Sequence, residues 1–227
     1  MRYILLLFAA AALTASCSKP HHHEDTPIPD NGCIERIDIK LSQQAQPALT
    51  AEQVRTADSL LDANHVHHDN YRYLAYHQDT LNGGFEQFIQ VDQYANGLRL
   101  FASQINFVFS NGILYFTTAA PTKGTTLDTI PSLILARLRT LFSGDLQKQE
   151  LGGSVSYGYR DSCYKAEFGY INIAADGAPE DLIKAWRVSI LYPAMTPGHS
   201  DLNDEPYAIY KDGNGQLIAF VGNLIIN

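Results

Sequence analysis

The stretch KAWRVSI at residues 184–190 alternates apolar and polar side chains, which is the pattern of a β-strand that buries one face. The residues expected to share one face are Trp186, Val188 and Ile190, with Arg187 and Ser189 on the opposite face. A strand with a single apolar face needs other elements to cover that face. We therefore expect a half-buried strand over 183–191.

The stretch YAIYKDGNGQLI at residues 207–218 indicates two more strands joined by a tight turn. Apolar and aromatic residues flank Asp212-Gly213-Asn214-Gly215, and glycine and asparagine are residues that tight turns favour. The four turn residues look like a calcium loop at a glance, but a hairpin turn explains their glycines. We expect strands over 206–211 and 216–226, and another over 164–173.

A helix is expected ahead of these strands. Pro131 would open it, because proline is favoured in the first helical turn, and Gly144 would end it. Residues 119–128 contain threonine, glycine and proline and mark a boundary before the helix. The apolar residues that form its buried stripe are Ile134, Leu138, Leu141 and Phe142.

The preceding part of the chain repeats the order of helix and strands. Thr50 and Gln53 have the spacing of a capping box, so we expect an amphipathic helix over 50–63. Asn96-Gly97 and Asn111-Gly112 are strong hairpin signals, because both turn positions tolerate positive φ. Residues 71–118 are therefore expected to form an antiparallel meander of four or five strands.

The predicted fold class is α+β, with two halves that each combine a helix with an antiparallel sheet. The expected domains are a helix plus antiparallel meander over 33–120 and a helix plus antiparallel sheet over 121–227.

The second half resembles a PepSY domain. The resemblance lies in the helix at 131–142, the strand around Tyr164–Ile173, the AWRV-type strand at 184–190, and the aromatic strand, Asp-x-x-Gly turn and apolar strand at 207–218. The first half, with its helix, Tyr71–His77 and the two Asn-Gly hairpins, is similar to the fungalysin/thermolysin propeptide module.

Together the two halves resemble the prosegment of a thermolysin-like metalloprotease. In that family the prosegment assists the folding of its protease and inhibits the protease until it is removed. No His-Glu-x-x-His sequence occurs in the 227 residues. The resemblance therefore implies a propeptide-like module without a protease domain, one that binds or inhibits another envelope protein.

The N-terminus is expected to be a lipoprotein signal peptide over 1–16. Arg2 precedes an apolar run, and small residues lead to Cys17, as in a bacterial lipobox with lipid on the cysteine. The alternative is an ordinary cleaved signal with an incidental cysteine. Residues 17–32 are polar and rich in proline and histidine, so we expect a flexible tether.

The expected location is the outer membrane, with a lipid anchor and with the body on either the periplasmic or the surface-exposed face. Ser18 after Cys17 resembles the pattern of outer-membrane sorting, and the Glu24-Asp25 pair resembles a surface-export signal. The net charge of -8 argues against nucleic acid as a partner.

Two cysteines remain after Cys17, namely Cys33 and Cys163. In an oxidising envelope they could form a disulfide between the start of the body and its second half. The alternative is a pair of buried thiols. Sequence leaves both open, because a bridge depends on the distance between the Cα atoms.

Candidate metal ligands have simpler explanations. His65 and His68 are three residues apart at the expected end of the first helix, where positive charge also suits the helix dipole. The acidic residues from Asp201 to Glu205 could hold calcium but are typical of a polar surface loop, and His21–His23 lie in the tether. We expect no metal and no cofactor.

Nothing in the sequence indicates catalysis. There is no Gly-x-Ser-x-Gly elbow, and Cys163 has no context that suggests an activated thiol. The expected function is binding of another envelope protein, in which a protease is one candidate. The alternative is a surface lipoprotein that binds a small ligand or a glycan through its aromatic strands.

Overall fold

The computed structural model describes residues 32–39, 49–81, 84–122, 124–152, 162–174, 180–191 and 206–222. Cys17, His21–His23 and Asp201–Glu205 lie outside the described residues. The described elements are β1 (Ile34–Ile37), α1 (Ala51–Ala63), β2 (Tyr71–Leu81), β3 (Gly84–Ala95), β4 (Leu98–Ser110), β5 (Ile113–Thr117), α2 (Leu135–Leu151), β6 (Tyr164–Asn172), β7 (Leu182–Ile190), β8 (Tyr207–Lys211) and β9 (Leu217–Val221).

The expected α+β layout of two separate antiparallel halves is wrong. The nine strands belong to one mixed sheet with the order β2-β3-β4-β6-β7-β8-β9, with β1 beside β6 and β5 beside β4. Two of the pairings are parallel: β1 with β6, and the start of β4 with β6. Only two helices accompany these strands in the described chain, so the protein is richer in β structure than we expected.

The joint between β4 and β6 is what makes the sheet continuous. Leu100 and Phe101 pair with Tyr170 and Ile171. This pairing requires the two backbones to lie very close, because a Cβ on Gly169 would come within 2.4 Å of the Arg99 carbonyl oxygen. Glycine is the residue that permits such an approach. Local sequence patterns carry no signal for a pairing between segments so far apart in the chain.

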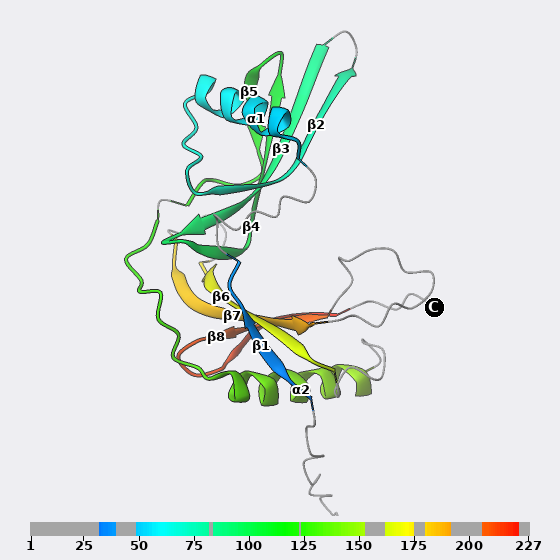
Figure 1. Ribbon diagram of the computed structural model, residues 1–227, viewed down its shortest axis with the longest axis vertical. Helices are drawn as coiled ribbons and strands as arrows, with labels where there is room; N and C mark the ends of the chain where they lie inside the picture. The colour runs from blue at the N-terminus through cyan, green and yellow to red at the C-terminus, as the bar shows by residue number, and fades with distance from the viewer. Residues whose placement is uncertain are drawn as a thin grey trace, which may run out of the picture.

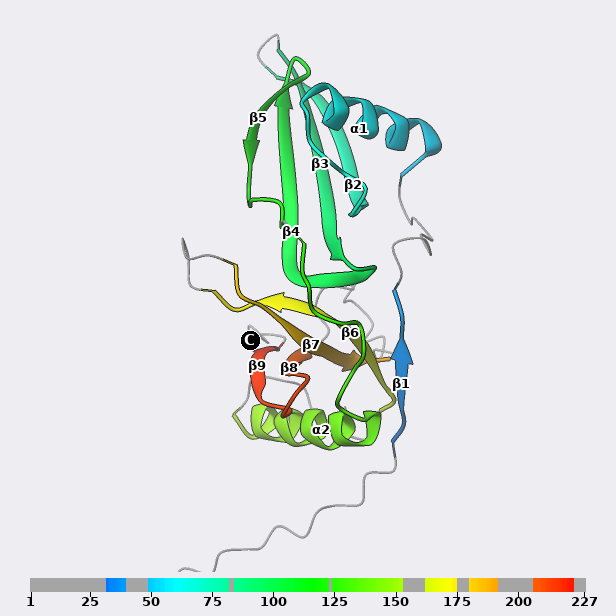
Figure 2. The same ribbon diagram turned by 90° about the vertical axis from the view of Figure 1, so that its left-hand side faces the viewer.

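The β3–β4 hairpin bends where it meets β6. Ala102 has a φ of 55°, and the β3–β4 register shifts between Asp92 and Tyr94. Such irregularities bend a strand and increase its local twist. As a result, the long strands β2, β3 and β4 form the upper part of the molecule together with α1 (Figures 1 and 2). Strands β6, β7 and β8 lie across the lower part, with α2 beneath them.

Each helix covers its own part of the sheet. Ala57 and Leu61 of α1 pack on the core formed by β2, β3 and β4. Leu138, Phe142 and Leu146 of α2 pack on β6, β7 and β8. Trp186 of β7 lies in this second core and is 1% exposed.

The expected capping box of α1 is confirmed. The Gln53 amide nitrogen donates to the Thr50 hydroxyl at 3.2 Å, and the Thr50 amide donates to the Gln53 side chain at 2.8 Å. The helix ends at Ala63, as its periodicity predicts. The four strands between Tyr71 and Thr117 also agree with the predicted meander, and both Asn-Gly turns have positive φ at both residues.

The predicted ends of the second helix are wrong. α2 begins at Leu135, four residues after Pro131, and runs through Gly144 to Leu151. Ile134 caps the helix and is 69% exposed, so it is not part of the buried stripe. Burial of Leu146 stabilises the continued helix by about 1.5–3 kcal/mol, which exceeds the roughly 1 kcal/mol that an interior glycine costs.

The described residues contain no helix that combines the length and apolar character needed to cross a membrane.

Candidate functional site

A cleft of about 670 Å³ lies on the face of β6 and β7 that is opposite α2. Side chains alternate along a strand, so Tyr164, Ala166 and Phe168 face the helix while Lys165 and Glu167 face the cleft. Five strands contribute to it or flank it. The lining residues are Ile37, Ile39, Arg99, Phe101, Ala102, Gln104, Lys165, Glu167, Arg187, Ser189, Tyr207 and Ile209.

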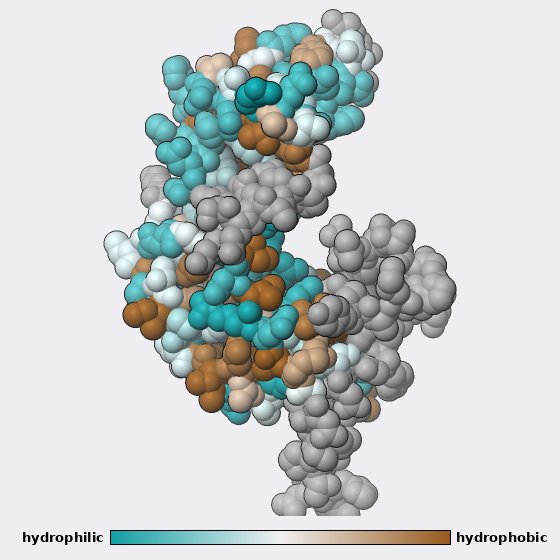
Figure 3. Space-filling model, in the orientation of Figure 1, coloured by the Kyte–Doolittle hydropathy of each residue, from teal (hydrophilic) through white to brown (hydrophobic). Residues whose placement is uncertain are grey.

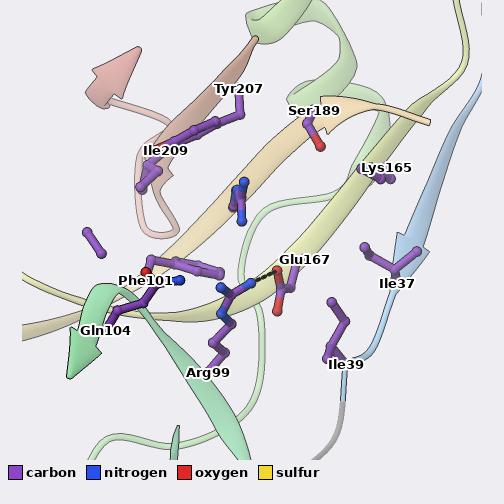
Figure 4. A pocket seen from close by; sticks show the side chains of 12 residues that line it. Ile37, Ile39, Arg99, Phe101, Gln104, Lys165, Glu167, Ser189, Tyr207 and Ile209 are labelled. Carbon is purple, nitrogen blue, oxygen red and sulfur yellow. Dashed lines mark ion pairs between the residues drawn. The ribbon is translucent and has the colours of Figure 1, made fainter. Parts of the chain in front are cut away.

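The cleft has apolar side walls and a charged middle. Figure 4 shows Ile37 and Ile39 along one side, Tyr207 and Ile209 on the other, and Glu167 between them. Hydrophilic and hydrophobic residues also lie side by side over β1, β6 and β7 on this face of the molecule (Figure 3). A lining of this kind suits a ligand that has both apolar and charged groups.

Arg99 links the bent hairpin to the floor of the cleft. Its guanidinium lies 2.9 Å from the Asp92 carboxylate and 3.6 Å from the Glu167 carboxylate. Both carboxylates are nearly buried, at 2% and 4% exposure. Arg99 therefore has two acidic partners, and the ion pair drawn in Figure 4 fixes its position over β6.

Glu167 is the buried acid of the cleft. Burial raises the pKa of its carboxyl above the usual value, and the positive charges of Arg99 and Arg187 oppose this shift without cancelling it. Its Oε1 atom is buried and accepts no hydrogen bond from the described residues. An unsatisfied buried acceptor is costly, so this oxygen is a place where a ligand donor would be stabilised.

Arg187 is held by an aromatic ring. Its guanidinium carbon lies 4.3 Å from the centroid of the Tyr207 ring, within cation–π distance. Its Nε atom is buried without a hydrogen-bond partner, and no carboxylate of the described chain is within 4.0 Å of the guanidinium. The orientation of the Arg187 guanidinium is thus fixed, and its Nε–H can donate a hydrogen bond to a ligand.

The disulfide candidates lie together in the structure. Cys33 and Cys163 are joined by a disulfide with a Cα–Cα distance of 4.5 Å. Arg139 of α2 donates to the backbone oxygens of Cys33 and Ser162 and lies over the Tyr164 ring. Because the disulfide fixes the start of β1 beside β6, it also helps to position Ile37 in the cleft.

The histidines near the first helix contact acids but form no metal centre in the described residues. His68 Nε2 lies 3.1 Å from Asp62, and Nδ1 lies 3.5 Å from Asp58. Asp58 accepts a hydrogen bond from the Tyr73 hydroxyl. No group of three or more His, Cys, Asp or Glu side chains in the described ranges has the arrangement of a metal site.

Asp212 proves to be a structural anchor of the turn that follows β8. Its carboxylate is fully buried and accepts hydrogen bonds from the amides of Ser132 and Leu133 and from Trp186 Nε1. Burial alone would raise the pKa of this carboxyl, but these hydrogen bonds outweigh burial and lower it. The turn is thereby fastened to the segment that leads into α2.

A second exposed surface lies on β5. Ile113 and Tyr115 are 70% and 81% exposed, and Phe116 is also exposed. The Asn64 side chain, however, accepts from the Leu114 amide and donates to the Gly112 carbonyl. These backbone groups are therefore not available to an added strand, and the cleft is the better-defined site.

Sequence patterns did not identify Arg99, Glu167 or Arg187. The only local signal is that Glu167 interrupts an otherwise apolar and aromatic run in 166–171. The side chains converge because β4, β6 and β7 become neighbours in the sheet, and that neighbourhood is set by long-range pairing.

Comparisons with known proteins leave the family open. No family model matches the chain, and no curated protein matches it. One similar solved structure is the crystal structure of an uncharacterized protein from Eubacterium rectale ATCC 33656, at 12% identity and a TM-score of 0.38. The match covers 75% of this chain and spans 56% of that chain, and a likeness at this level carries no argument about function.

Proposed function

We propose that this chain is a binding module of the cell envelope, anchored by lipid on Cys17, and that its cleft holds a segment of another envelope protein. The observation that carries the proposal is the lining of the cleft, where apolar walls flank a charged floor. An extended peptide presents side chains alternately to opposite sides, so it can contact both walls while polar groups reach the floor.

The resemblance to protease prosegments supports a protein as the occupant. Prosegments of thermolysin-like proteases act by binding another polypeptide, and this chain resembles them in the segments at 184–190 and 207–218. A protease of the same envelope is the first partner to test. Fold alone does not decide function, so the test has to address the cleft directly.

The proposal is tested with a photo-crosslinking amino acid placed at Gln104, an exposed residue that lines the cleft. The matched control carries the same amino acid at Arg137, which is exposed on α2. In intact cells we expect adducts with a defined protein segment from position 104 and not from 137. Mapped by mass spectrometry, that segment should bind the purified chain as a synthetic peptide. Identical adducts from both positions would overturn the proposal.

A small molecule is the second candidate occupant. The volume of the cleft, about 670 Å³, falls within the roughly 300–1,000 Å³ typical of small-ligand sites. Adducts of position 104 with an envelope oligosaccharide, with no protein adduct formed, would favour this second function.

A further inference from the structure

The cleft has a charge balance opposite to that of the whole chain. Its lining contains three basic side chains, Arg99, Lys165 and Arg187, and one acidic side chain, Glu167, and the Asp92 carboxylate beside Arg99 adds a second negative charge. The whole chain has 24 acidic and 16 basic residues. A local excess of positive charge in an acidic protein attracts an anionic group to that place.

Arg187 is the cation that can receive such a group. Arg99 already contacts the carboxylates of Asp92 and Glu167, so its charge is largely neutralised. Arg187 has no carboxylate within 4.0 Å in the described chain, and its buried Nε lacks an acceptor. The Tyr207 ring fixes the plane of its guanidinium before any ligand arrives.

The geometry points to a carboxylate of the bound segment as the group that pairs with Arg187. This inference rests on the proposed function, and it specifies what the cleft recognises. A guanidinium presents two parallel N–H donors that match the two oxygens of a carboxylate. The unpartnered Oε1 of Glu167 on the adjacent strand can accept a backbone N–H from the same segment.

Glu167 also bears on which ligand the cleft prefers. Glu167 of β6 lies directly opposite Arg187 of β7 in the register of the two strands. When ionised it repels a negative charge placed beside it, so the group that suits Glu167 is an N–H donor and the group that suits Arg187 is an anion. The hydroxyl oxygens of a neutral sugar could accept hydrogen bonds from Arg187 but would leave its positive charge without a counter-charge. A peptide carboxylate with an adjacent amide satisfies both residues.

The test uses an array of random nine-residue peptides probed with the fluorescently labelled mature chain. Each peptide is present as a C-terminal amide and as a free acid, so that side-chain and terminal carboxylates are told apart. We expect bound peptides to be enriched in Asp or Glu, or to be bound only as free acids. Replacing a selected side-chain carboxylate by its amide, such as Glu by Gln, should weaken binding at least tenfold. For peptides that bind through the C-terminus, replacing the free acid by the C-terminal amide should have the same effect.

Variants of the chain then identify the receptor. Arg187→Gln should weaken binding of the selected peptides at least tenfold, and Arg187→Lys should recover part of it, because the charge remains and the paired donors do not. Arg55→Gln, on the exposed side of α1, is the matched control and should bind as the parent does. Circular dichroism melting of each variant shows whether it is folded. The peptide substitutions need no protein variant, so they test the inference even if Arg187→Gln unfolds.

The peptide array separates carboxylate recognition by Arg187 from peptide binding by the cleft. Peptides that bind equally well with and without a carboxylate would overturn the inference about Arg187 and leave the peptide-binding cleft in place. An array with no bound peptide, together with no adduct at position 104, would overturn the proposed function and the inference with it.

Discussion

Single buried carboxylates have opposite consequences in this protein, depending on their partners. Asp212 is fully buried yet accepts from three N–H donors, the backbone amides of Ser132 and Leu133 and the indole of Trp186. Glu167 is nearly as buried but has one ion-pair partner, the Arg99 guanidinium at 3.6 Å, and an unsatisfied oxygen. The Asp212 carboxylate fastens the turn after β8 to the segment before α2, whereas the Glu167 carboxylate lines the cleft with one oxygen unsatisfied. Hydrogen bonds rather than burial make the difference.

Replacing Asp212 by alanine is expected to destabilise the protein by roughly 2–4 kcal/mol. The substitution leaves the Trp186 indole N–H and two backbone amides without their acceptor in a buried position. Urea unfolding of the variant and the parent at pH 7 measures the change. Asp69→Ala, at an exposed position, should change stability by less than about 0.5 kcal/mol. Equal effects of the two substitutions would contradict the anchoring role of Asp212.

The raised pKa of Glu167 predicts a pH dependence of stability. The folded state holds the proton more tightly than the unfolded chain, whose pKa is near 4.5. Stability is therefore lost as the pH rises through 4.5 and on through the higher folded pKa. Glu167→Gln removes this loss, so the stability of the parent relative to the variant should decline between pH 4 and pH 8. A constant difference for Glu167→Gln would refute the shift.

At the scale of elements, the sequence placed most strands and the first helix well, because their signals are local. The capping box at Thr50 and Gln53 and the Asn-Gly turns depend on neighbouring residues only. The ends of α2 were placed wrongly for the opposite reason. A glycine at position 144 favours the end of an isolated helix. In the folded protein, however, Leu146 packs into the core two residues later, and this burial stabilises the continued helix.

Gly144→Ala is expected to stabilise the protein by up to about 1 kcal/mol. The position is in the interior of α2, nothing lies within 4 Å of an added Cβ, and alanine favours the helix. Gly215→Ala is the matched contrast, since φ is +74° there and the new Cβ would lie 2.7 Å from Leu141. That variant should be destabilised. Thermal unfolding of both variants decides the point, and a loss of stability in Gly144→Ala would show that the helix does not continue through this residue.

At the scale of the whole molecule, the disulfide and the β4–β6 joint hold distant parts of the chain around the cleft. The disulfide links residues separated by 130 positions, and it fastens β1 to the middle of the sheet. The joint at Leu100 and Phe101 brings Arg99 over Glu167. The cleft therefore depends on both connections.

Replacing both Cys33 and Cys163 by serine is expected to destabilise the protein by about 2–5 kcal/mol, because the cross-link restricts a long loop in the unfolded chain. Because Ile37 lines the cleft next to this link, the peptides selected on the array should also bind more weakly. Urea unfolding and peptide titration, each with and without dithiothreitol, measure the two effects. The reductant should reproduce them in the parent and change nothing in the double variant. An unchanged midpoint in the double variant would be evidence against a structural disulfide.

The sequence by itself determined the elements that depend on short-range physics. Alternation predicted the strand that carries Trp186, turn residues predicted the hairpins, and the capping box predicted the start of α1. The tertiary structure alone decided that these elements form one mixed sheet and not two halves. It also decided that Arg99, Glu167 and Arg187 face one cleft. The physical reason is that strand pairing satisfies backbone hydrogen bonds without regard to side-chain identity, so the choice of partner strand depends on the packing of the whole chain.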